Sequence, residues 1–320
     1  TESIKIVELG YRSLPKEKYL GEYFYLPKYF LEEAKKIAPS KILAIMLNEK
    51  DVTIKDLHIL DDCVGNIDLI RLAVDPLNLK RALKLAKKIK DKGFKVAINL
   101  MYMSKWANDT NFLASLKDTE NKIDYLYLVD SYGSTDPEEV FKLVCDIKNL
   151  ISTPIGFHGH NNLELALINS SKALEAGCSI VDVTISGMGR GAGNLRTELF
   201  LTYLSSKKKI DFNLIKFTEI VDKVEELKDY YKWGVSFPYI ISGAYSLKQA
   251  EVMNWISKKR YDLNTIVNAL QNKKNELIDN IKLKVFKNNH KFNIALIVGG
   301  GVSVKKHTQV IKKYLSLNKN

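Results

Sequence analysis

The chain has 320 residues, of which 46% are hydrophobic, and 49 Lys and Arg against 37 Asp and Glu give a formal net charge of +12. This length and apolar content allow one large hydrophobic core and exclude a disordered chain. No apolar run approaches the roughly 18 residues of a membrane-spanning helix, and no signal peptide opens the chain, so we expect no membrane partner. Cys63, Cys145 and Cys178 lack C-x-x-C spacing, which is typical of reduced residues in a cytoplasmic protein.

The positive charge raises the alternative of a nucleic-acid partner. The lysines fall mainly on the outer faces of predicted helices, as in residues 80–90, and no recognition motif or aromatic-interleaved basic stretch accompanies them. We therefore expect no nucleic-acid partner, but a solvated basic surface that helps attract anionic substrates.

Apolar, β-branched segments alternate along the chain with segments of helical periodicity. The predicted strands are residues 4–9, 41–47, 69–74, 95–101, 125–129, 154–157 and 180–185. Predicted helices between them include residues 79–92, 137–150 and 164–175, the last capped by Asn161 or Asn162 and closed by Gly177. This alternation is typical of a parallel sheet with crossover helices, and seven such strands in succession favour an α/β TIM barrel over an open sheet.

The remainder of the chain predicts two further parts. We assign residues 1–205 to the barrel domain, 206–281 to a helical extension, and 282–320 to a linker and the first βα unit of a second domain. Residues 292–298 read as a buried strand, followed by Gly299–Gly301 and a helical run to Leu317. This pattern resembles the opening of a nucleotide-binding α/β unit, although the G-x-G-x-x-G spacing is not met. Aromatic residues in the extension predict core or interface packing, with a lid over the site as the alternative.

Polar residues recur where the predicted strands end. They are Glu8, Arg12, Asn48, Arg71, Asp75, Asn99, Tyr102, Asp130, His158, His160 and Ser186. The carboxyl ends of barrel strands form one rim, and barrel enzymes carry their chemistry there. We therefore expect an active site at this rim.

His158 and His160 are the most specific pair among these residues. In a strand, residues i and i+2 project from the same face, so the two imidazoles converge. Two neutral imidazoles are a natural half of a metal site. The alternative is a polar cluster that satisfies its own hydrogen bonds.

Four segments of the chain resemble the HMG-CoA lyase-like metal-dependent aldolases and lyases, which include 4-hydroxy-2-oxovalerate aldolase, HMG-CoA lyase and isopropylmalate synthase. The segments are Val7–Gly10, Val129–Gly133, the His158/His160 pair, and the Gly193–Asn194 turn with Glu198. The resemblance covers residues 1 to about 280 and places these segments at strands two, six, seven and eight of a TIM barrel. It extends to a bacterial branch of aldolase catalytic domain proteins that is often linked to surface-polysaccharide loci.

The resemblance implies a divalent cation, Mg²⁺, Mn²⁺, Co²⁺ or Zn²⁺, held by His158 and His160 with Asn194 as a direct or water-bridged ligand. It implies an aldolase or lyase that makes or breaks a C–C bond through a metal-stabilised enolate of a 2-oxo acid, with pyruvate as the expected case. The implied partners are an aldehyde or sugar acceptor, in surface-polysaccharide sugar biosynthesis, and further copies of the chain in a homo-oligomer.

Glu8, Arg12, Arg71 and Asp130 complete the predicted catalytic set. A guanidinium fork matches carboxylate or phosphate bidentately, so Arg12 and Arg71 are candidates for anion recognition. The alternative for each arginine is a structural ion pair with a rim carboxylate such as Glu8. For Asp130 we expect orientation of a neighbour or a water rather than metal ligation.

One family feature does not occur in the sequence. The family's first strand ends in a Leu-Arg-Asp-Gly-type motif with a metal-ligating Asp, and no Arg-Asp-Gly triplet occurs here. Thr1 precedes what aligns as strand two, so we expect an incomplete chain rather than a seven-stranded barrel with two exposed edges. Two alternatives stay open: a non-catalytic barrel that acts as a scaffold or regulatory subunit, and an acyl-CoA-condensing synthase. No feature looks dedicated to CoA, which favours the aldolase.

Overall fold

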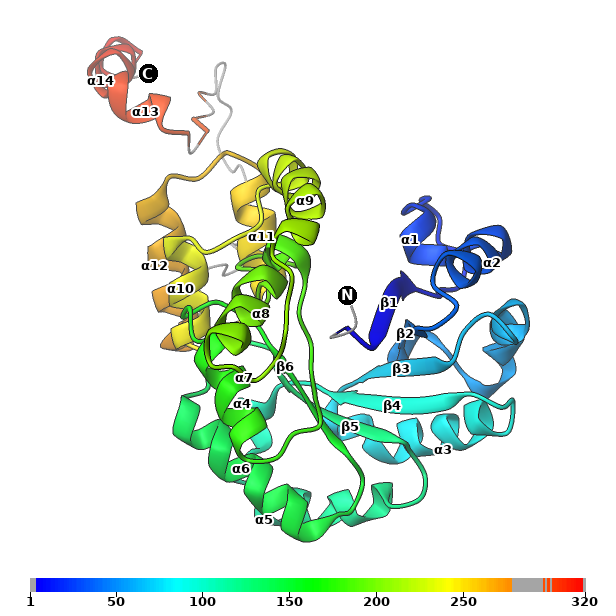
Figure 1. Cartoon of the computed structure of the whole chain (residues 1–320). Helices are drawn as coiled ribbons and strands as arrows, with labels where there is room; N and C mark the ends of the chain where they lie inside the picture. The colour runs from blue at the N-terminus through cyan, green and yellow to red at the C-terminus, as the bar shows by residue number, and fades with distance from the viewer. Residues whose placement is uncertain (1–3, 278–295, 297, 300, 319–320) are drawn as a thin grey trace. The chain divides into compact units, whose positions relative to one another are not determined.

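The computed structural model describes residues 4–277, 296, 298–299 and 301–318 (Figure 1). The chain packs into two compact units, Thr1–Val252 and Met253–Asn320. The sequence predicted that the barrel domain ends at residue 205. The first unit extends further and includes the first helices of the predicted helical extension.

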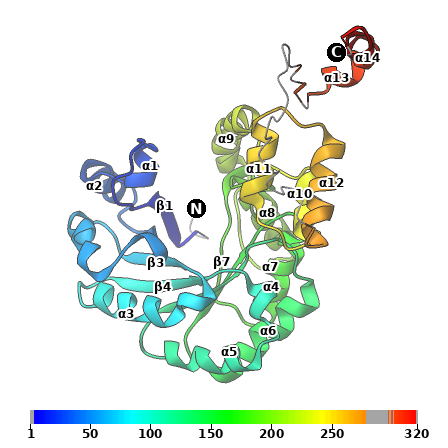
Figure 2. The ribbon, with the colours of Figure 1, turned by 180° about the vertical axis from the view of Figure 1, so that it is seen from behind.

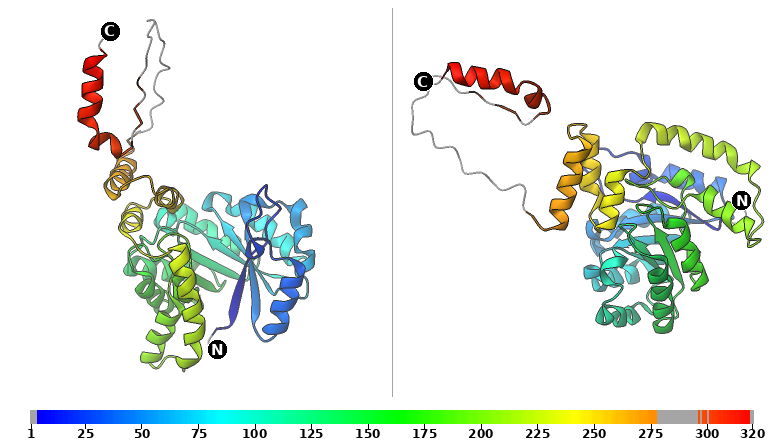
Figure 3. Two further views of the ribbon diagram at one scale, coloured as in Figure 1. Left: turned by 90° about the horizontal axis from the view of Figure 1, so that it is seen from above. Right: turned by 90° about the vertical axis from the view of Figure 1, so that its left-hand side faces the viewer.

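A seven-stranded parallel sheet forms the centre of the first unit, with the strands hydrogen-bonded in chain order. They are β1 (Ile6–Tyr11), β2 (Ile42–Asn48), β3 (Leu69–Val74), β4 (Lys95–Leu100), β5 (Tyr125–Asp130), β6 (Ile155–Gly159) and β7 (Ile180–Val181). The sheet curls into a half-barrel (Figures 1 and 3), which confirms the predicted TIM-barrel-like α/β fold.

The predicted strand at 180–185 is much shorter in the structure, where β7 covers only two residues. Beyond Val181 the chain leaves the β6 ladder, and Thr184 instead forms a parallel bridge with Arg196. Ser186 then takes a left-handed conformation, with φ 51°, which turns the chain away from the strand direction.

Helices and 3₁₀ segments connect the strands. The helices of the first unit are α1 (Glu22–Tyr25), α2 (Lys28–Ile37), α3 (Leu79–Lys90), α4 (Met103–Trp106), α5 (Thr110–Ser115), α6 (Pro137–Leu150), α7 (Ala166–Glu175), α8 (Thr197–Ser206), α9 (Thr218–Tyr231) and α10 (Phe237–Ala244). The 3₁₀ segments are η1 (Glu49–Asp51), η2 (Ile54–Cys63), η3 (Pro76–Asn78), η4 (Leu116–Thr119), η5 (Ile185–Gly187) and η6 (Ile215–Phe217). Helix α6 has the predicted bounds because Asp136 and Glu139 form a capping box at its start.

The strands present two different faces. On the outer face, Ile70, Leu72 and Val74 of β3 join the main core together with α3, which lies along that face (Figures 1 and 2). On the inner face, a small layer forms around Tyr127 from Ala44, Leu69 and Ala97. Because side chains alternate along a strand, polar residues two positions further along β3 and β4 also face the interior.

The second unit is helical in its described part. Helix α11 (Gln249–Ser257) crosses the boundary between the units and is followed by α12 (Leu263–Lys274), α13 (Ser303–Lys306) and α14 (Thr308–Leu317). The strand predicted at 292–298 falls almost entirely outside the described residues and stays a prediction. Among the described helices, none combines the length and apolar character needed to cross a membrane.

Candidate active site

Arg71 lies at the centre of a polar network inside the curled sheet. Its side chain is only 6% exposed. Nη1 donates to Glu8 Oε2 at 2.9 Å, Nη2 donates to Asp182 Oδ2, and Nε donates to Asn99 Oδ1 at 3.2 Å. The guanidinium carbon lies 4.2 Å from the centre of the Tyr127 ring. The network therefore ties together β1, β3, β4, β5 and the segment that follows β7.

A glycine on the neighbouring strand makes room for this arrangement. Tyr127 of β5 is paired with Gly156 of β6, and a Cβ at Gly156 would lie 2.5 Å from the tyrosine ring. The absence of a side chain there lets the ring lie against the sheet beneath Arg71. The ring face then contributes a cation–π interaction that helps hold the buried guanidinium.

The two carboxylates on Arg71 differ in their affinity for protons. Partial loss of hydration raises the pKa of Glu8 above its usual range, although Arg71 opposes the shift and 29% of the Glu8 side chain stays exposed. Burial acts in the same direction on Asp182, but Arg71 and His158 outweigh it, so the pKa of Asp182 is lowered. Glu8 is consequently the carboxylate that exchanges a proton more readily, and Asp182 stays ionised.

His158 lies on β6 and His160 directly follows the last residue of that strand, with the two ring centroids 5.0 Å apart. His158 Nδ1 lies 2.9 Å from Asp182 Oδ2, and His160 Nδ1 lies 2.8 Å from the carbonyl oxygen of Asp130. Because a carbonyl and an ionised carboxylate can only accept, both Nδ1 atoms donate, which leaves both Nε2 atoms available as ligands. Burial is the main cause that lowers the pKa of His160 to about 3, and the charge of Arg190 acts in the same direction, so the His160 imidazole is neutral.

Asp130 positions its surroundings through both its side chain and its backbone. Its buried carboxylate accepts from the backbone amides of Ser134, at 3.1 Å, and Thr135, at 3.2 Å. Burial nevertheless raises the pKa of this carboxyl. The Asp130 carbonyl oxygen meanwhile orients His160. These contacts agree with an orienting role.

Asn194 lies beside His160. The two residues form an antiparallel bridge, in which opposing Cα atoms lie about 4.5–5.5 Å apart. The Asn161 amide adds a hydrogen bond of 3.0 Å to the Gly193 carbonyl. Asn194 Nδ2 donates to Met188 O at 2.9 Å, but its buried Oδ1 has no hydrogen-bond partner. An unpaired buried oxygen is costly unless something binds it.

These donor atoms fit a divalent cation. Within the described ranges, no cluster of three or more His, Cys, Asp or Glu has the geometry of a metal site. Two imidazole Nε2 atoms and the orphaned amide oxygen of Asn194 nevertheless form a mixed nitrogen and oxygen set from one chain. Such sets suit several divalent metals, with water or substrate completing the shell.

Arg12 occupies a different environment from Arg71. Its Nε donates to Ile59 O at 2.8 Å, and its Nη1 donates to Tyr25 O and Leu26 O. Its Nη2 forms an ion pair of 2.8 Å with Asp62. These contacts tie the end of β1 to α1 and η2, as in the structural alternative for this residue. They include none of the other predicted site residues.

The sequence did not single out Asp182, Tyr127 or Arg190. Asp182 falls within the alternating pattern of the predicted strand 180–185, although its position after two half-buried β-branched residues was a usable signal. Tyr127 reads as an ordinary core residue. Arg190 lies in the turn between Gly187 and Gly193, where its side chain is exposed. Within the described part of the chain it has no hydrogen-bond or ion-pair partner, yet its charge acts on both His160 and Tyr11.

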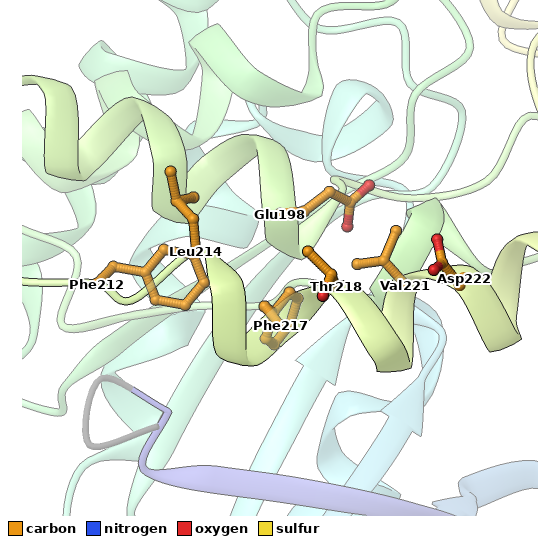
Figure 4. Close-up of a pocket in the computed structure, with 7 residues that line it drawn as sticks. All are labelled: Glu198, Phe212, Leu214, Phe217, Thr218, Val221 and Asp222. Atoms are coloured by element: carbon orange, nitrogen blue, oxygen red, sulfur yellow. The ribbon is translucent and has the colours of Figure 1, made fainter.

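A pocket of about 250 Å³ lies elsewhere in the first unit (Figure 4). Its lining residues are Glu198, Phe212, Leu214, Phe217, Thr218, Val221 and Asp222. No predicted catalytic or metal residue lines it. Glu198, part of the family resemblance, accepts a hydrogen bond of 3.1 Å from the Ser186 amide and so braces the segment that leads into the glycine-rich turn.

Comparisons with known proteins identify a related family and related folds. The model of the HMGL-like family matches residues 74–225, which include Asp130, both histidines, Asp182 and Asn194. A 4-hydroxy-2-oxovalerate aldolase from Geobacillus genomosp. 3 is 31% identical over 204 residues, which cover 62% of this chain and 58% of the relative. An oxaloacetate decarboxylase from Mycobacterium tuberculosis is 29% identical over 147 residues, 46% of this chain and 44% of the relative. The chain thus spans less than two thirds of these curated relatives.

Solved structures show the same fold. The crystal structure of the N-terminal domain of a "putative aldolase" from Bacteroides vulgatus has a TM-score of 0.78 and 43% identity, with 83% of this chain and 88% of that chain covered. The carboxyl transferase domain of Rhizobium etli pyruvate carboxylase, with pyruvate and biocytin, has a TM-score of 0.63 at 16% identity, covering 81% of this chain and 48% of that one. The second likeness concerns the fold alone.

Proposed function

Because the chain belongs to the HMGL-like family, we propose that it is a divalent-metal-dependent lyase or aldolase that breaks or forms a carbon–carbon bond of a 2-oxo acid. The observation that supports the proposal is a set of available ligand atoms on three neighbouring residues at the end of β6. His158 and His160 keep their Nε2 atoms available, and the Asn194 amide oxygen beside them has no partner.

These three side chains would hold the cation. When bound, it would supply Lewis-acid stabilisation of negative charge on the substrate. Asp182 supports His158 from behind, since a carboxylate on Nδ1 fixes the tautomer that leaves Nε2 as a ligand. The Asp130 carbonyl does the same for His160.

The names of the curated relatives support a 2-oxo acid as the substrate class. Both 4-hydroxy-2-oxovalerate and oxaloacetate carry a carboxylate next to a keto group. In each, cleavage between C3 and C4 leaves the enolate of pyruvate, so one enolate-stabilising site serves both reactions. We extend the proposal to an aldehyde or sugar as the acceptor, in surface-polysaccharide sugar biosynthesis, and to a homo-oligomer in the cytoplasm.

In the proposed reaction Glu8 moves the proton at C3. Its carboxylate takes a proton from the pyruvate methyl group, the C–H electron pair becomes the C=C bond, and the charge moves to the keto oxygen. Burial raises the pKa of Glu8, which suits a group that must both accept and return a proton. Arg71 holds the carboxylate in place through the 2.9 Å ion pair.

We assign recognition of an anionic substrate group to Arg190. The guanidiniums of Arg71 and Arg12 are held by protein acceptors, whereas that of Arg190 is exposed and has no partner among the described residues. Its charge acts on His160 and Tyr11, so it lies within electrostatic reach of the same site, and in this proposal it stands at the mouth of that site. A guanidinium suits a carboxylate or a phosphate equally well.

A direct test of this function incubates the protein with pyruvate and a panel of aldehydes and sugars, and with the corresponding 2-oxo acids in the cleavage direction. We expect pyruvate to be consumed or released with at least one member of the panel. The turnover should stop with a chelator and return with added Mn²⁺ or Co²⁺. Turnover that is unaffected by chelation, or none with any 2-oxo acid under metal-replete conditions, would contradict the proposal.

A further inference from the structure

We propose that Gln249 is a positioning residue that sets the spacing between the two loops that carry His160 and Asn194. The inference rests on the proposed function, because it concerns the same cation site. Gln249 opens α11, well separated in sequence from both loops, and touches neither of the ligand side chains in any described contact.

The Gln249 side chain bridges the two loops with one hydrogen bond to each. Its Nε2 donates to Asn162 Oδ1 at 2.9 Å, and its Oε1 accepts from the Ala192 amide at 3.2 Å. Asn162 lies two residues after His160, and Ala192 lies two residues before Asn194. One side chain thus holds each loop at a residue that lies two positions from a proposed ligand.

The loop that carries His160 is anchored further by α10. Asn162 is fully buried, and its Nδ2 donates to Tyr239 O at 2.9 Å and contacts Ser242 Oγ at 3.4 Å. The polar chain therefore runs from α10 through Asn162 and Gln249 to Ala192. Buried networks of this kind hold one geometry well when every member is paired, and poorly when one member is lost.

Glycines allow the close approach of these segments. A Cβ on Gly243 of α10 would lie 2.6 Å from Asn162 Cβ, and a Cβ on Gly133 would lie 2.7 Å from the Asn162 amide nitrogen. A Cβ on Gly191 would collide with Gln249 Oε1. The loops therefore pack closely around the Asn162 and Gln249 side chains, with no space for an added methyl group at these glycines.

The location of Gln249 favours a role in positioning the two loops over a role in stabilising the whole fold. The apolar core between the sheet and its helices does not include Gln249. Loss of its side chain leaves the Ala192 amide and Asn162 Oδ1 without partners and frees the turn from Gly187 to Gly193 to move. The expected consequence is a weaker cation site on an otherwise folded protein.

The test compares the whole chain with Gln249→Met, which keeps the length of the side chain but neither hydrogen bond. Co²⁺ binding to the metal-free proteins is measured by titration calorimetry. We expect a loss of affinity of about 10-fold, at the lower end of what groups behind metal ligands contribute. Gln271→Met, at an exposed position of α12, is the matched control and should bind like the wild type.

Amide hydrogen exchange of the metal-free proteins provides a second measurement that does not depend on metal. In Gln249→Met the Asn161 amide, which bonds across the two loops to Gly193 O, should exchange faster than in the wild type. The Gly193 and Asn194 amides, which bond to Arg190 O and Gly187 O within the turn, should do the same. Unchanged exchange, or unchanged Co²⁺ affinity in a folded variant, would overturn the role of Gln249. Absence of Co²⁺ binding to the wild type would contradict the proposed function instead, and the exchange measurement would still decide the role of Gln249.

Discussion

At the residue scale, the site depends on how one buried guanidinium divides its contacts. Arg71 holds Glu8 and Asp182 at the same time, but Asp182 also accepts from His158. The additional partner keeps Asp182 ionised, whereas burial leaves Glu8 with a raised pKa. Two carboxylates of similar intrinsic acidity thereby acquire different roles, one as a support for a ligand and the other as a carrier of the proton.

Removal of the carboxylate of Glu8 should abolish proton transfer. For Glu8→Gln we expect the exchange of the pyruvate methyl protons with solvent to slow by about 10²- to 10⁴-fold, the usual contribution of a positioned acid or base. Glu17→Gln, at an exposed position, is the control. Methyl exchange within about 3-fold of the wild-type rate in Glu8→Gln would show that another group carries the proton.

The same residue should leave a signature in the pH dependence of stability. The pKa of Glu8 is raised in the folded protein, so the folded state binds this proton more tightly than the unfolded state. The resulting stabilisation is fully present below about pH 4, near the pKa of an exposed Glu, and is lost as the pH rises through the raised pKa. The Glu8→Gln variant has no carboxyl group at this position, so its stability does not show this decrease with pH.

We therefore expect the free energy of unfolding of Glu8→Gln, relative to the wild type, to increase as the pH rises above about 4. The slope is at most about 1.4 kcal/mol per pH unit, because one proton is involved. Urea unfolding at several pH values measures it. A relative stability that is constant or that falls with pH would mean that the pKa of Glu8 is not raised.

Arg190 should affect substrate binding more than chemistry. Arg190→Gln removes an exposed cation at the mouth of the site without breaking a described hydrogen bond or ion pair. We expect KM for the anionic substrate to rise about 10-fold, by the loss of roughly 1.4 kcal/mol of binding energy, while kcat changes little. Arg260→Gln, at an exposed position remote in sequence, is the control. A fall in kcat with unchanged KM would instead place Arg190 among the reacting groups.

At the scale of elements, local pattern predicted much of the sheet but not its contacts. Strand 69–74 and helix 137–150 were predicted at their observed bounds, because alternation and capping are local signals. The alternating pattern of residues 180–185 predicted a strand three times as long as β7. There the strand ends early, and Asp182 forms a tertiary hydrogen bond with Arg71, which is 111 residues away in sequence. No local signal encodes a contact over that separation.

The pairing of β5 and β6 makes Gly156 a sensitive position. Gly156→Ala places a methyl group against the Tyr127 ring, which must shift from beneath Arg71. We expect a destabilisation of about 1–3 kcal/mol, as for other overpacked interiors, measured as a lower urea midpoint. Gly299→Ala, where an added Cβ would meet nothing within 4 Å, is the control. Unchanged stability of Gly156→Ala would show that the ring is not confined by β6.

At the scale of the whole molecule, the first compact unit contains every residue of the candidate site. The fold class follows from the sequence because seven strands recur at barrel spacing, each with an outer apolar face. The i, i+2 spacing predicted that the imidazoles of the histidine pair converge, and their ring centroids lie 5.0 Å apart. The metal-binding role of the pair stays a prediction. Its supports, Asp182 and the Asp130 carbonyl, became visible only in three dimensions, because they come from neighbouring strand ends.

The net charge of +12 makes the chain basic, and a basic surface favours the approach of anionic substrates. Arg71 alone cannot provide their recognition, because Glu8 and Asp182 neutralise it. We therefore expect the basic surface to attract a small anionic substrate, and few side chains inside the site to bind it directly.

The most direct test of metal-supported enolate chemistry at His158 and His160 is proton exchange. Pyruvate is incubated in deuterated water with the metal-loaded protein, and the methyl signal is followed by proton NMR. The methyl protons should exchange with solvent without a second substrate, and exchange should require the divalent metal. It should vanish in the His158→Ala, His160→Ala double variant and persist in His58→Ala, whose exposed imidazole lies outside the site. Exchange that persists in the double variant, or that is absent from the metal-loaded wild type for every small 2-oxo acid, would contradict a metal-dependent lyase at this rim.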